Sequence, residues 1–287
     1  MPELPEVETL KQELEPELKG KTVERIKVWE PKTVLPLRPR QFRDKLKNRS
    51  VVELERQAKL LLIKLDQGYL MIHLKMTGQM IFIPGQGEAV IGGHPQPGGT
   101  DNLPNRFTRL AIYLTDGSTL YFNDMRKFGW VRFSPDPNQE TFITGIGIEP
   151  LSKQFTTEVL TEFINKYPKR KIKQLLLDQG LIAGLGNIYV DEALHLSGLR
   201  PDRSVTKIKD QEIKLLHQAI QSVLRLSIKK KGTSFRDYKR SNGQPGGFVS
   251  YLKVYSRAGQ PCLYCGQPIK KIKLAGRGTH YCSECQK

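Results

Sequence analysis

The chain has little cysteine, no long apolar stretch and a shortage of acidic residues. It contains no run of about 18 consecutive apolar residues, the length that crosses a bilayer. The segment from Met1 to Glu8 lacks the basic and then apolar pattern of a secretion signal. We find neither a lipidation signal nor a concentrated basic amphipathic helix of the kind that binds membrane surfaces. These absences predict a cytoplasmic protein that does not associate with membranes.

The shortage of acidic residues indicates the kind of partner. The chain has 46 Lys and Arg residues against 29 Asp and Glu, which gives a formal net charge of +17. Such an excess of positive charge is typical of proteins that bind a polyanion, most often nucleic acid. With 287 residues the chain can form two domains, or one domain and a small module, each with its own core.

All the cysteines lie close to the C-terminus. The pairs Cys262-x2-Cys265 and Cys282-x2-Cys285 are separated by residues 266–281, a spacing typical of zinc ribbons. Four thiolates complete a tetrahedral site, so we predict one structural Zn2+ ion. Two disulfides are the alternative, but the chain lacks the secretory features that would accompany them. The residues between the pairs fit either a hairpin against a phosphate backbone or a solvated basic face: Lys270, Lys271, Lys273 and Arg277.

The N-terminus carries the sharpest chemical signal. Removal of Met1 would leave Pro2 as a secondary amine, and α-amino groups titrate at about 7.7–8.0. Such an amine is available as a nucleophile near neutral pH, and its attack on an aldehyde-level carbon gives an iminium cation that accepts electrons. Glu3, the next residue, could move the proton in that step. The competing interpretation is that Pro2, Glu3 and Glu6 simply begin a helix.

The first half of the chain shows one helix followed by short strands. Gly20 ends a helical pattern of apolar residues, namely Val7, Leu10, Leu14 and Leu18. The predicted strands are rich in β-branched or aliphatic residues and cover 22–29, 50–56, 59–65, 69–74, 108–114 and 118–122. Asp116-Gly117 predicts a hairpin between the last two. The predicted fold class is α+β, with an N-terminal helix on an antiparallel β-sandwich.

The second half has helical periodicity. Thr156 or Thr157 can cap a helix that Pro168 stops, and further helices are expected over 171–177, 188–196 and 208–228. The glycine-rich turn 180–187 resembles the connection of a helix–turn–helix. Its last residue, Asn187, would cap the next helix, and the exposed amides there would hold a phosphate. The expected parts are a catalytic β-sandwich (1–133), a linker (134–151), a helical DNA-binding domain (152–247) and a zinc finger (248–287).

One segment fits none of these elements. The run between Pro84 and Pro104 is dense in glycine and proline and has no apolar period. It is too long for a tight connection, so we expect a mobile surface excursion and assign it no role.

Several separated motifs together resemble the formamidopyrimidine-DNA glycosylase family, the bifunctional base-excision enzymes of bacteria that remove oxidised purines. The shared stretches, in order along the chain, are 2–8 (PELPEVE), Ala58-Lys59, 73–78 (HLKMTG), 124–129 (DMRKFG), 184–189 (GLGNIY), 244–246 (QPG) and the cysteine ribbon. The resemblance implies a β-sandwich, a helix-two-turn-helix domain and a terminal zinc finger. It also implies damaged double-stranded DNA as the partner.

The resemblance implies catalytic roles at matching positions. Pro2 would attack C1′ of the damaged nucleotide and displace the base, while Glu3 would protonate or polarise the ring oxygen. Lys59 would contact the lesion or its phosphate and assist elimination. Arg277 would bind phosphates beside the lesion and help the second elimination. The strand would then be cut on both sides of the lesion by β,δ-elimination.

The resemblance also implies contacts to DNA. Because C1′ is hidden in a duplex, the nucleotide must be flipped out, and the trio Met76, Arg126 and Phe128 would fill the hole. Thr77-Gly78 and Lys127, beside them, indicate loop tips. Glu192 would lie near the base pocket, and residues 241–247 would form a lid over the flipped base. Further DNA contacts would come from Arg109, Lys127, Lys169, Lys173 and Asn187, although many relatives carry His in place of Arg109.

Two other functions compete with this interpretation. Endonuclease VIII shares the architecture and the Pro-Glu start but prefers oxidised pyrimidines; Leu4-Pro5 and the intact lid segment favour the purine enzyme. A catalytically silent zinc-ribbon DNA-binding protein would fit the charge and the cysteines equally well, and only Pro2, Glu3 and Lys59 argue against it. With one active site for one duplex, we expect a monomer that works on the nucleoid.

Overall fold

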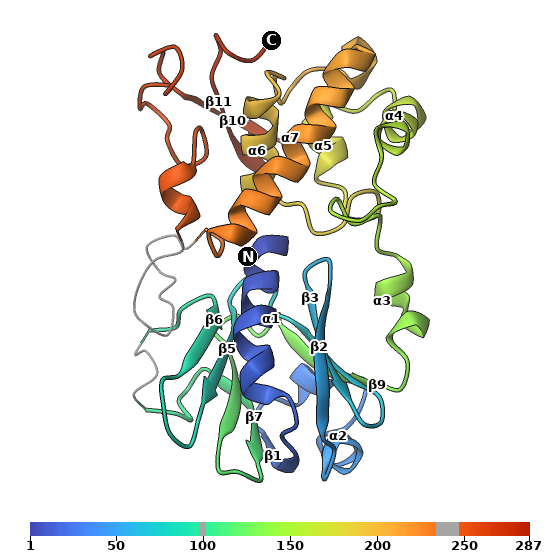
Figure 1. Cartoon of the computed structure of the whole chain (residues 1–287), viewed down its shortest axis with the longest axis vertical. Coiled ribbons are helices and arrows are strands. Elements are labelled where there is room, and N and C mark those ends of the chain that lie inside the picture. The colour runs from blue at the N-terminus through green and yellow to red at the C-terminus, as the bar shows by residue number, and fades with distance from the viewer. Residues whose placement is uncertain (98–101, 234–246) are drawn as a thin grey trace. The chain divides into compact units, whose positions relative to one another are not determined.

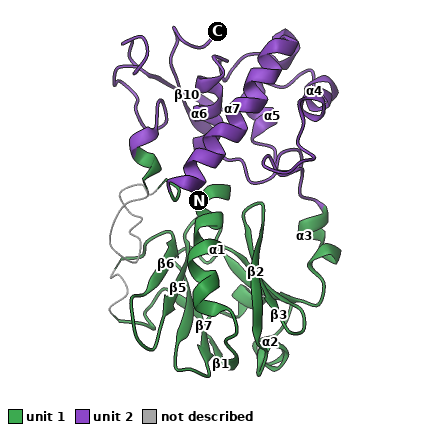
Figure 2. Ribbon diagram, in the orientation of Figure 1, with its two compact units in different colours: residues 1–144, 231–249 green, residues 145–230, 250–287 purple. Residues whose placement is uncertain are grey.

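The structure is a computed structural model that describes residues 1–97, 102–233 and 247–287. It divides into two compact units, which Figure 2 colours separately. Unit 1 comprises residues 1–144 and 231–249, and unit 2 comprises residues 145–230 and 250–287. The four-part division expected from the sequence has finer boundaries than this and stays a prediction.

Unit 1 is a sandwich of two antiparallel sheets (Figure 1). One sheet has the order β1-β7-β8-β5-β6 and the other β2-β3-β4-β9. Their strands are β1 (Val23–Val28), β2 (Val51–Gln57), β3 (Leu60–Leu65), β4 (Tyr69–His73), β5 (Gly78–Ile83), β6 (Val90–Gly93), β7 (Thr108–Leu114), β8 (Thr119–Asp124) and β9 (Trp130–Ser134). The expected α+β class with an antiparallel sandwich is confirmed.

Helices cover both open sides of this sandwich. Helix α1 (Leu4–Leu18) packs against the edge strands β6 and β2, one from each sheet. On the other side, α2 (Pro39–Leu46) packs against the edge strands β1 and β9, with Phe42 and Leu46 buried. Covering the edges shields their unpaired backbone groups from pairing with another chain. The sequence pattern predicted α1 but missed α2.

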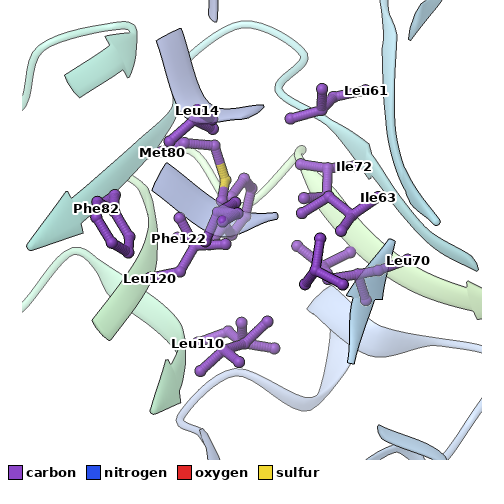
Figure 3. Packing of buried hydrophobic residues seen from close by; sticks show 14 of the residues in the cluster. Leu14, Leu61, Ile63, Leu70, Ile72, Met80, Phe82, Leu110, Leu120 and Phe122 are labelled. Carbon is purple, nitrogen blue, oxygen red and sulfur yellow. The ribbon is translucent and has the colours of Figure 1, made fainter. Parts of the chain in front are cut away.

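The core lies between the two sheets. Alternate residues of each strand point inward, such as Met80 and Phe82 of β5 opposite Ile63 of β3, and Leu14 of α1 joins them (Figure 3). All of these side chains are at most 2 % exposed. Val7, in the first turn of α1, belongs to the same cluster, so burial of this apolar layer helps to hold that turn in place.

The glycine- and proline-rich run over 84–104 is more structured than expected. Its residues Val90–Gly93 form β6, which pairs with β5. Leu103 packs beside a second apolar cluster of Ile81, Ala111 and Tyr121. The sequence pattern did not predict strand β6, and the expected mobility of the run stays a prediction. Residues 98–101 lie outside the described part of the chain.

Unit 2 is mainly helical. Its helices are α4 (Thr157–Lys166), α5 (Ile172–Leu176), α6 (Asn187–Leu196) and α7 (Asp210–Lys229). Helix α6 packs against both α5 and α7. As predicted, the Thr156 hydroxyl caps α4 by accepting a hydrogen bond from the backbone N–H of Val159. The connection from α5 to α6 runs through the glycine-rich turn. Within this turn Gly184 has φ +84°, a conformation that glycine adopts readily.

The C-terminal part of unit 2 is a short hairpin of β10 (Lys270–Leu274) and β11 (Arg277–Tyr281). Its turn is Ala275-Gly276, where both residues have positive φ. Strand β11 packs against α6. Among the described residues, no helix combines the length and apolar character that crossing a membrane requires.

Candidate functional site

The N-terminus of unit 1 is tied down at the start of α1. Glu3 is the N-cap residue, and its backbone N–H donates to Glu6 Oε2 at 2.9 Å. The other oxygen, Glu6 Oε1, accepts from both the backbone N–H (2.8 Å) and the hydroxyl (2.9 Å) of Thr233. Glu6 is only 8 % exposed, and hydrogen bonds to a charged, buried acceptor are strong. Pro2 is half-buried and directly precedes the N-cap residue, so it lies beside a helix start that these hydrogen bonds fix.

Lys59 lies in the turn between β2 and β3. Its neighbour Ala58 has φ +53°, so the turn is tight. Arg56 holds this turn to α1, because its guanidinium donates to Ala58 O at 2.9 Å and pairs with Glu8 at 2.7 Å. Lys59 is 7 % exposed, whereas an isolated lysine of unknown role would be expected at the surface. The structure thus joins the helix that carries Pro2 to the turn that carries Lys59.

The ring of His73, at the end of β4, is neutral at physiological pH. Its burial, with help from the charges of Lys75 and Lys59, lowers its pKa to about 3. The neutral ring accepts a hydrogen bond at Nδ1 from the Lys75 backbone N–H at 3.0 Å. It also packs against Trp130 and Phe142.

The predicted void-filling residues are exposed on neighbouring loops of unit 1. Met76 is 36 % exposed and Phe128 is 53 % exposed, both high for large apolar side chains. The Arg126 guanidinium lies over the Phe128 ring at 4.6 Å from its centre. The two loops meet where the Arg126 backbone N–H donates to the Thr77 hydroxyl at 3.0 Å.

The two basic residues beside this trio have partners within unit 1. The Lys127 ammonium pairs with Glu30 at 2.6 Å. Arg109 donates from Nε to the backbone oxygen of Asp124 at 2.7 Å and from Nη1 to that of Arg106. Arg109 remains half-buried, so its role at a phosphate stays a prediction.

In unit 2, Arg277 begins β11 at the tip of the hairpin and is exposed. It borders an open groove of about 340 Å3 that is also lined by Arg170, Gln174, Leu177, Asp178 and Ala275. Lys169 is exposed before α5. An exposed Arg277 and an exposed Lys169 are compatible with the phosphate contacts expected of them.

Two residues of unit 2 that were expected to contact DNA or to lie near the base pocket are buried. Lys173 is fully buried and pairs with the equally buried Asp191 at 2.5 Å, so its contact with a phosphate stays a prediction. Glu192 is 3 % exposed, and its carboxylate accepts hydrogen bonds from three consecutive backbone N–H groups, those of Lys253, Val254 and Tyr255, at 2.8–3.0 Å. It therefore anchors the chain that leads into the ribbon, and its position near a base pocket stays a prediction.

Asn187 also differs from its expected role as a cap. Gly186 occupies the N-cap position of α6, and Asn187 is the first helical residue. Its side-chain amide donates to Gly278 O at 2.9 Å. Asp191 accepts from the backbone N–H of His280 at 2.9 Å. Side chains of α6 thus hold the hairpin that presents Arg277, and a phosphate contact by Asn187 stays a prediction.

The four cysteines form a site that fits zinc. Their Sγ atoms all lie within 4.8 Å of one another, with 3.8 Å between Cys262 and Cys285 and 3.4 Å between Cys265 and Cys282. Tetrahedral coordination with Zn–S bonds of about 2.3 Å needs sulfur atoms about 3.8 Å apart. The predicted single structural zinc ion is confirmed in its ligand set. His195 Nε2 lies 3.8 Å from Cys262 Sγ and flanks the site.

The sequence interpretation missed the residues that support the site. Glu6 is the exception, because the sequence pattern already placed it at a helix start; it follows Glu3 by the three residues of a capping pattern. Asp191 gave no signal, because its pairing with Lys173 depends on two helices meeting in space. The same holds for Asp124 and Gln96, two buried polar residues of unit 1. Residues 241–246 of the predicted lid lie outside the described residues.

Three features together define a class of DNA glycosylases: a sandwich with Pro-Glu directly after Met1, a helical domain with a glycine-rich turn, and a four-cysteine ribbon. Family models match each of these parts. Residues 1–131 match the formamidopyrimidine-DNA glycosylase N-terminal domain, and residues 146–239 match the H2TH domain of the same enzymes. Residues 259–287 match a zinc finger found in FPG and IleRS.

Full-length relatives agree. The chain is 39% identical to the formamidopyrimidine-DNA glycosylase of Pelotomaculum thermopropionicum, covering 100% of this chain and 99% of the relative. It is 40% identical to that of Heliobacterium modesticaldum, covering 100% of both. The crystal structure of Lactococcus lactis Fpg with DNA containing N7-benzyl-Fapy-dG superposes with a TM-score of 0.87 at 33% identity and 100% coverage of both chains. The chain belongs to the formamidopyrimidine-DNA glycosylase family.

Proposed function

We propose that this protein excises oxidised purines, such as 8-oxoguanine and formamidopyrimidines, from duplex DNA and then cuts the abasic strand. The observation that carries the proposal is the position of Pro2 just before the N-terminus of α1. Hydrogen bonds among Glu3, Glu6 and Thr233 fix the first turn of this helix. A nucleophile held in one geometry does not lose orientational freedom when it attacks. The relatives' names and their solved complexes with lesion-containing DNA support the same substrate.

The proposed chemistry begins once Met1 is absent. The Pro2 nitrogen attacks C1′ and gives up its own proton, the glycosidic bond breaks, and the base leaves with the bonding electron pair and takes up a proton. Glu3 protonates the ring oxygen as the sugar opens, and loss of that C–O bond gives the iminium. Because the iminium withdraws electrons, a proton leaves C2′ and the 3′ phosphate departs. A second proton loss then expels the 5′ phosphate.

Lys59 would contact the lesion or its phosphate and assist the elimination, and Arg277 would bind phosphates beside the lesion and help the second elimination. Other residues would serve binding: Arg109, Lys127, Lys169 and Asn187 would contact the backbone further out. Met76, Arg126 and Phe128 would fill the space that the flipped nucleotide leaves. The zinc ion would take no part in the reaction, because four thiolates complete its coordination and leave no position open to substrate. It would instead hold the hairpin that carries Arg277.

The experiment compares strand cleavage on duplexes that contain 8-oxoguanine or thymine glycol, with borohydride present to reduce any iminium. The proposal expects faster cleavage at 8-oxoguanine and a covalent adduct that disappears when Pro2 is replaced. Faster cleavage at thymine glycol would indicate the endonuclease VIII specificity. Binding without cleavage or adduct would indicate a zinc-ribbon DNA-binding protein.

We also propose that the protein acts as a monomer in the bacterial cytoplasm, on nucleoid DNA. A single active site serves a single duplex and needs no second subunit. Light scattering after size-exclusion chromatography should give the mass of one chain, 32.7 kDa, in free solution. A stable mass of twice this value would contradict the proposal.

A further inference from the structure

A buried carboxylate connects the two loops that carry the void-filling residues. Asp124, at the end of β8, is 0 % exposed. Its Oδ2 accepts from the Gly129 backbone N–H at 2.7 Å, and its Oδ1 accepts from the Arg126 backbone N–H at 3.1 Å and from the Thr77 hydroxyl. A carboxylate with several donors of this kind fixes their relative positions strongly.

These contacts determine the positions of the exposed side chains of Met76 and Phe128. Arg126 and Gly129 enclose Phe128 within the loop that Asp124 holds at both ends. Thr77 follows Met76 directly, and its hydroxyl donates to Asp124 while accepting from the Arg126 N–H at 3.0 Å. Met76 and Phe128 are therefore held to one another through two residues, Thr77 and Asp124.

Gln96 adds a support from the glycine- and proline-rich run. It is 5 % exposed, and its Nε2 donates to Thr77 O at 2.6 Å and to His94 O at 2.8 Å. The His94 backbone N–H in turn donates to Gly78 O at 2.9 Å. The segment after β6 thus braces the Met76 loop through hydrogen bonds that do not involve Asp124.

We propose that Asp124, Thr77 and Gln96 are positioning residues that hold Met76, Arg126 and Phe128 ready to enter the DNA helix. The inference rests on the proposed function, because the trio would fill the hole left by a flipped nucleotide. Insertion of a wedge costs unstacking energy. A wedge that is already ordered adds no further ordering cost, whereas a loose loop would. This assigns a function to residues 94–96, which the sequence pattern left without a role.

The decisive variant is Gln96→Met, which keeps the side-chain length and removes both hydrogen bonds. Its matched control is Gln79→Met, since Gln79 is equally buried at 5 % and lies on β5. Two substrates separate wedge insertion from chemistry. Excision of 8-oxoguanine from a duplex needs the hole to be filled, whereas cleavage at an abasic site in a single strand leaves no orphaned base. 2-Aminopurine placed beside the lesion reports insertion of the wedge, because its fluorescence increases when the base is unstacked.

For Gln96→Met we expect a roughly tenfold loss of duplex excision and a weaker 2-aminopurine rise, from two lost buried hydrogen bonds. Cleavage of the single strand should change less than about twofold, and Gln79→Met should change neither activity. Asp124→Asn should lose about 100-fold on the duplex, since misplacement by about 1 Å has that effect. Where Asp124→Asn does not fold, Thr77→Val tests the same connection.

The inference is overturned if Gln96→Met and Thr77→Val retain wild-type duplex excision and 2-aminopurine signal. It is also overturned if both substrates are affected equally, because that is the result of general destabilisation. Failure of the proposed function looks different. The wild-type protein would then cleave neither substrate, and the 2-aminopurine comparison between wild type and Gln96→Met would still test the positioning role.

Discussion

The buried pair of Lys173 and Asp191 makes a sharp prediction, because each charge has been removed from water and is compensated by the other. Both side chains are 0 % exposed and their charged atoms are 2.5 Å apart. Lys173→Met would leave a buried, uncompensated Asp191. Loss of one partner of such a pair costs about 3–5 kcal/mol of unfolding free energy. Asp191→Leu should cost at least as much, since it also removes the acceptor of the His280 N–H.

The double variant tests the reasoning more strictly. Lys173→Met with Asp191→Leu removes both charges and leaves mainly the unsatisfied His280 N–H, which costs about 1–3 kcal/mol. The double variant should therefore be more stable than either single variant. Replacing a whole buried pair by apolar residues is often close to neutral for the same reason.

The assay is urea unfolding of the zinc-loaded protein, followed by far-UV circular dichroism and by zinc release to a coloured chelator. Trp29 and Trp130, the two tryptophans of the chain, lie in unit 1, so their fluorescence serves as an internal control. The reasoning is refuted if the single variants lose less than about 1 kcal/mol, the size of an exposed ion pair. It is also refuted if the losses of the two single variants simply add in the double variant.

Three further predictions concern binding, pH and the metal. Lys169→Met is the exposed counterpart of Lys173→Met and should leave the free energy of unfolding unchanged. It should reduce the magnitude of the slope of log DNA affinity against log salt concentration by about 0.9. An unchanged slope would show that Lys169 does not contact a phosphate. Because burial lowers the pKa of His73 to about 3 from 6.5, its contribution to stability is complete above about pH 6.5. That contribution falls by about 1.4 kcal/mol per pH unit as the pH decreases towards 3. Unfolding followed by tryptophan fluorescence should show this decline, and His73→Gln should weaken it; equal slopes would contradict the neutral ring. Chelation of zinc should abolish DNA binding and expose the ribbon to protease, and retention of full affinity in metal-free protein would contradict a structural zinc site.

The fold was largely predictable where local signals agreed with it. Six strands matched their predicted ranges closely, because their apolar residues and the Asp116-Gly117 turn act locally. Strand β6 was missed because Val90–Gly93 is half glycine and forms only by pairing with β5. Helix α2 was missed because its buried side chains, Phe42 and Leu46, are too few to show a period among charged residues.

The zinc site was predictable because the paired cysteines have few alternative interpretations. The role of Pro2 stays a prediction, since Pro2 and Glu3 could also simply begin a helix. The burial of Lys173 and Glu192 was not predicted, because a sequence shows that a residue is charged but not that it is buried. Their burial depends on contacts with Asp191, which is 18 residues from Lys173, and with the backbone at 253–255. The supporting bonds of Asp124 and Gln96 depend on tertiary contacts in the same way.

The most direct test of the account is to identify the residue that attacks the sugar. The protein is incubated with a duplex containing 8-oxoguanine, the iminium is reduced with borohydride, and the digested adduct is sequenced by mass spectrometry. The account predicts that the reduced sugar is attached to the nitrogen of Pro2 at the first position of a chain without Met1. An adduct at Lys59 or another lysine, or full cleavage by protein that retains Met1, would contradict it.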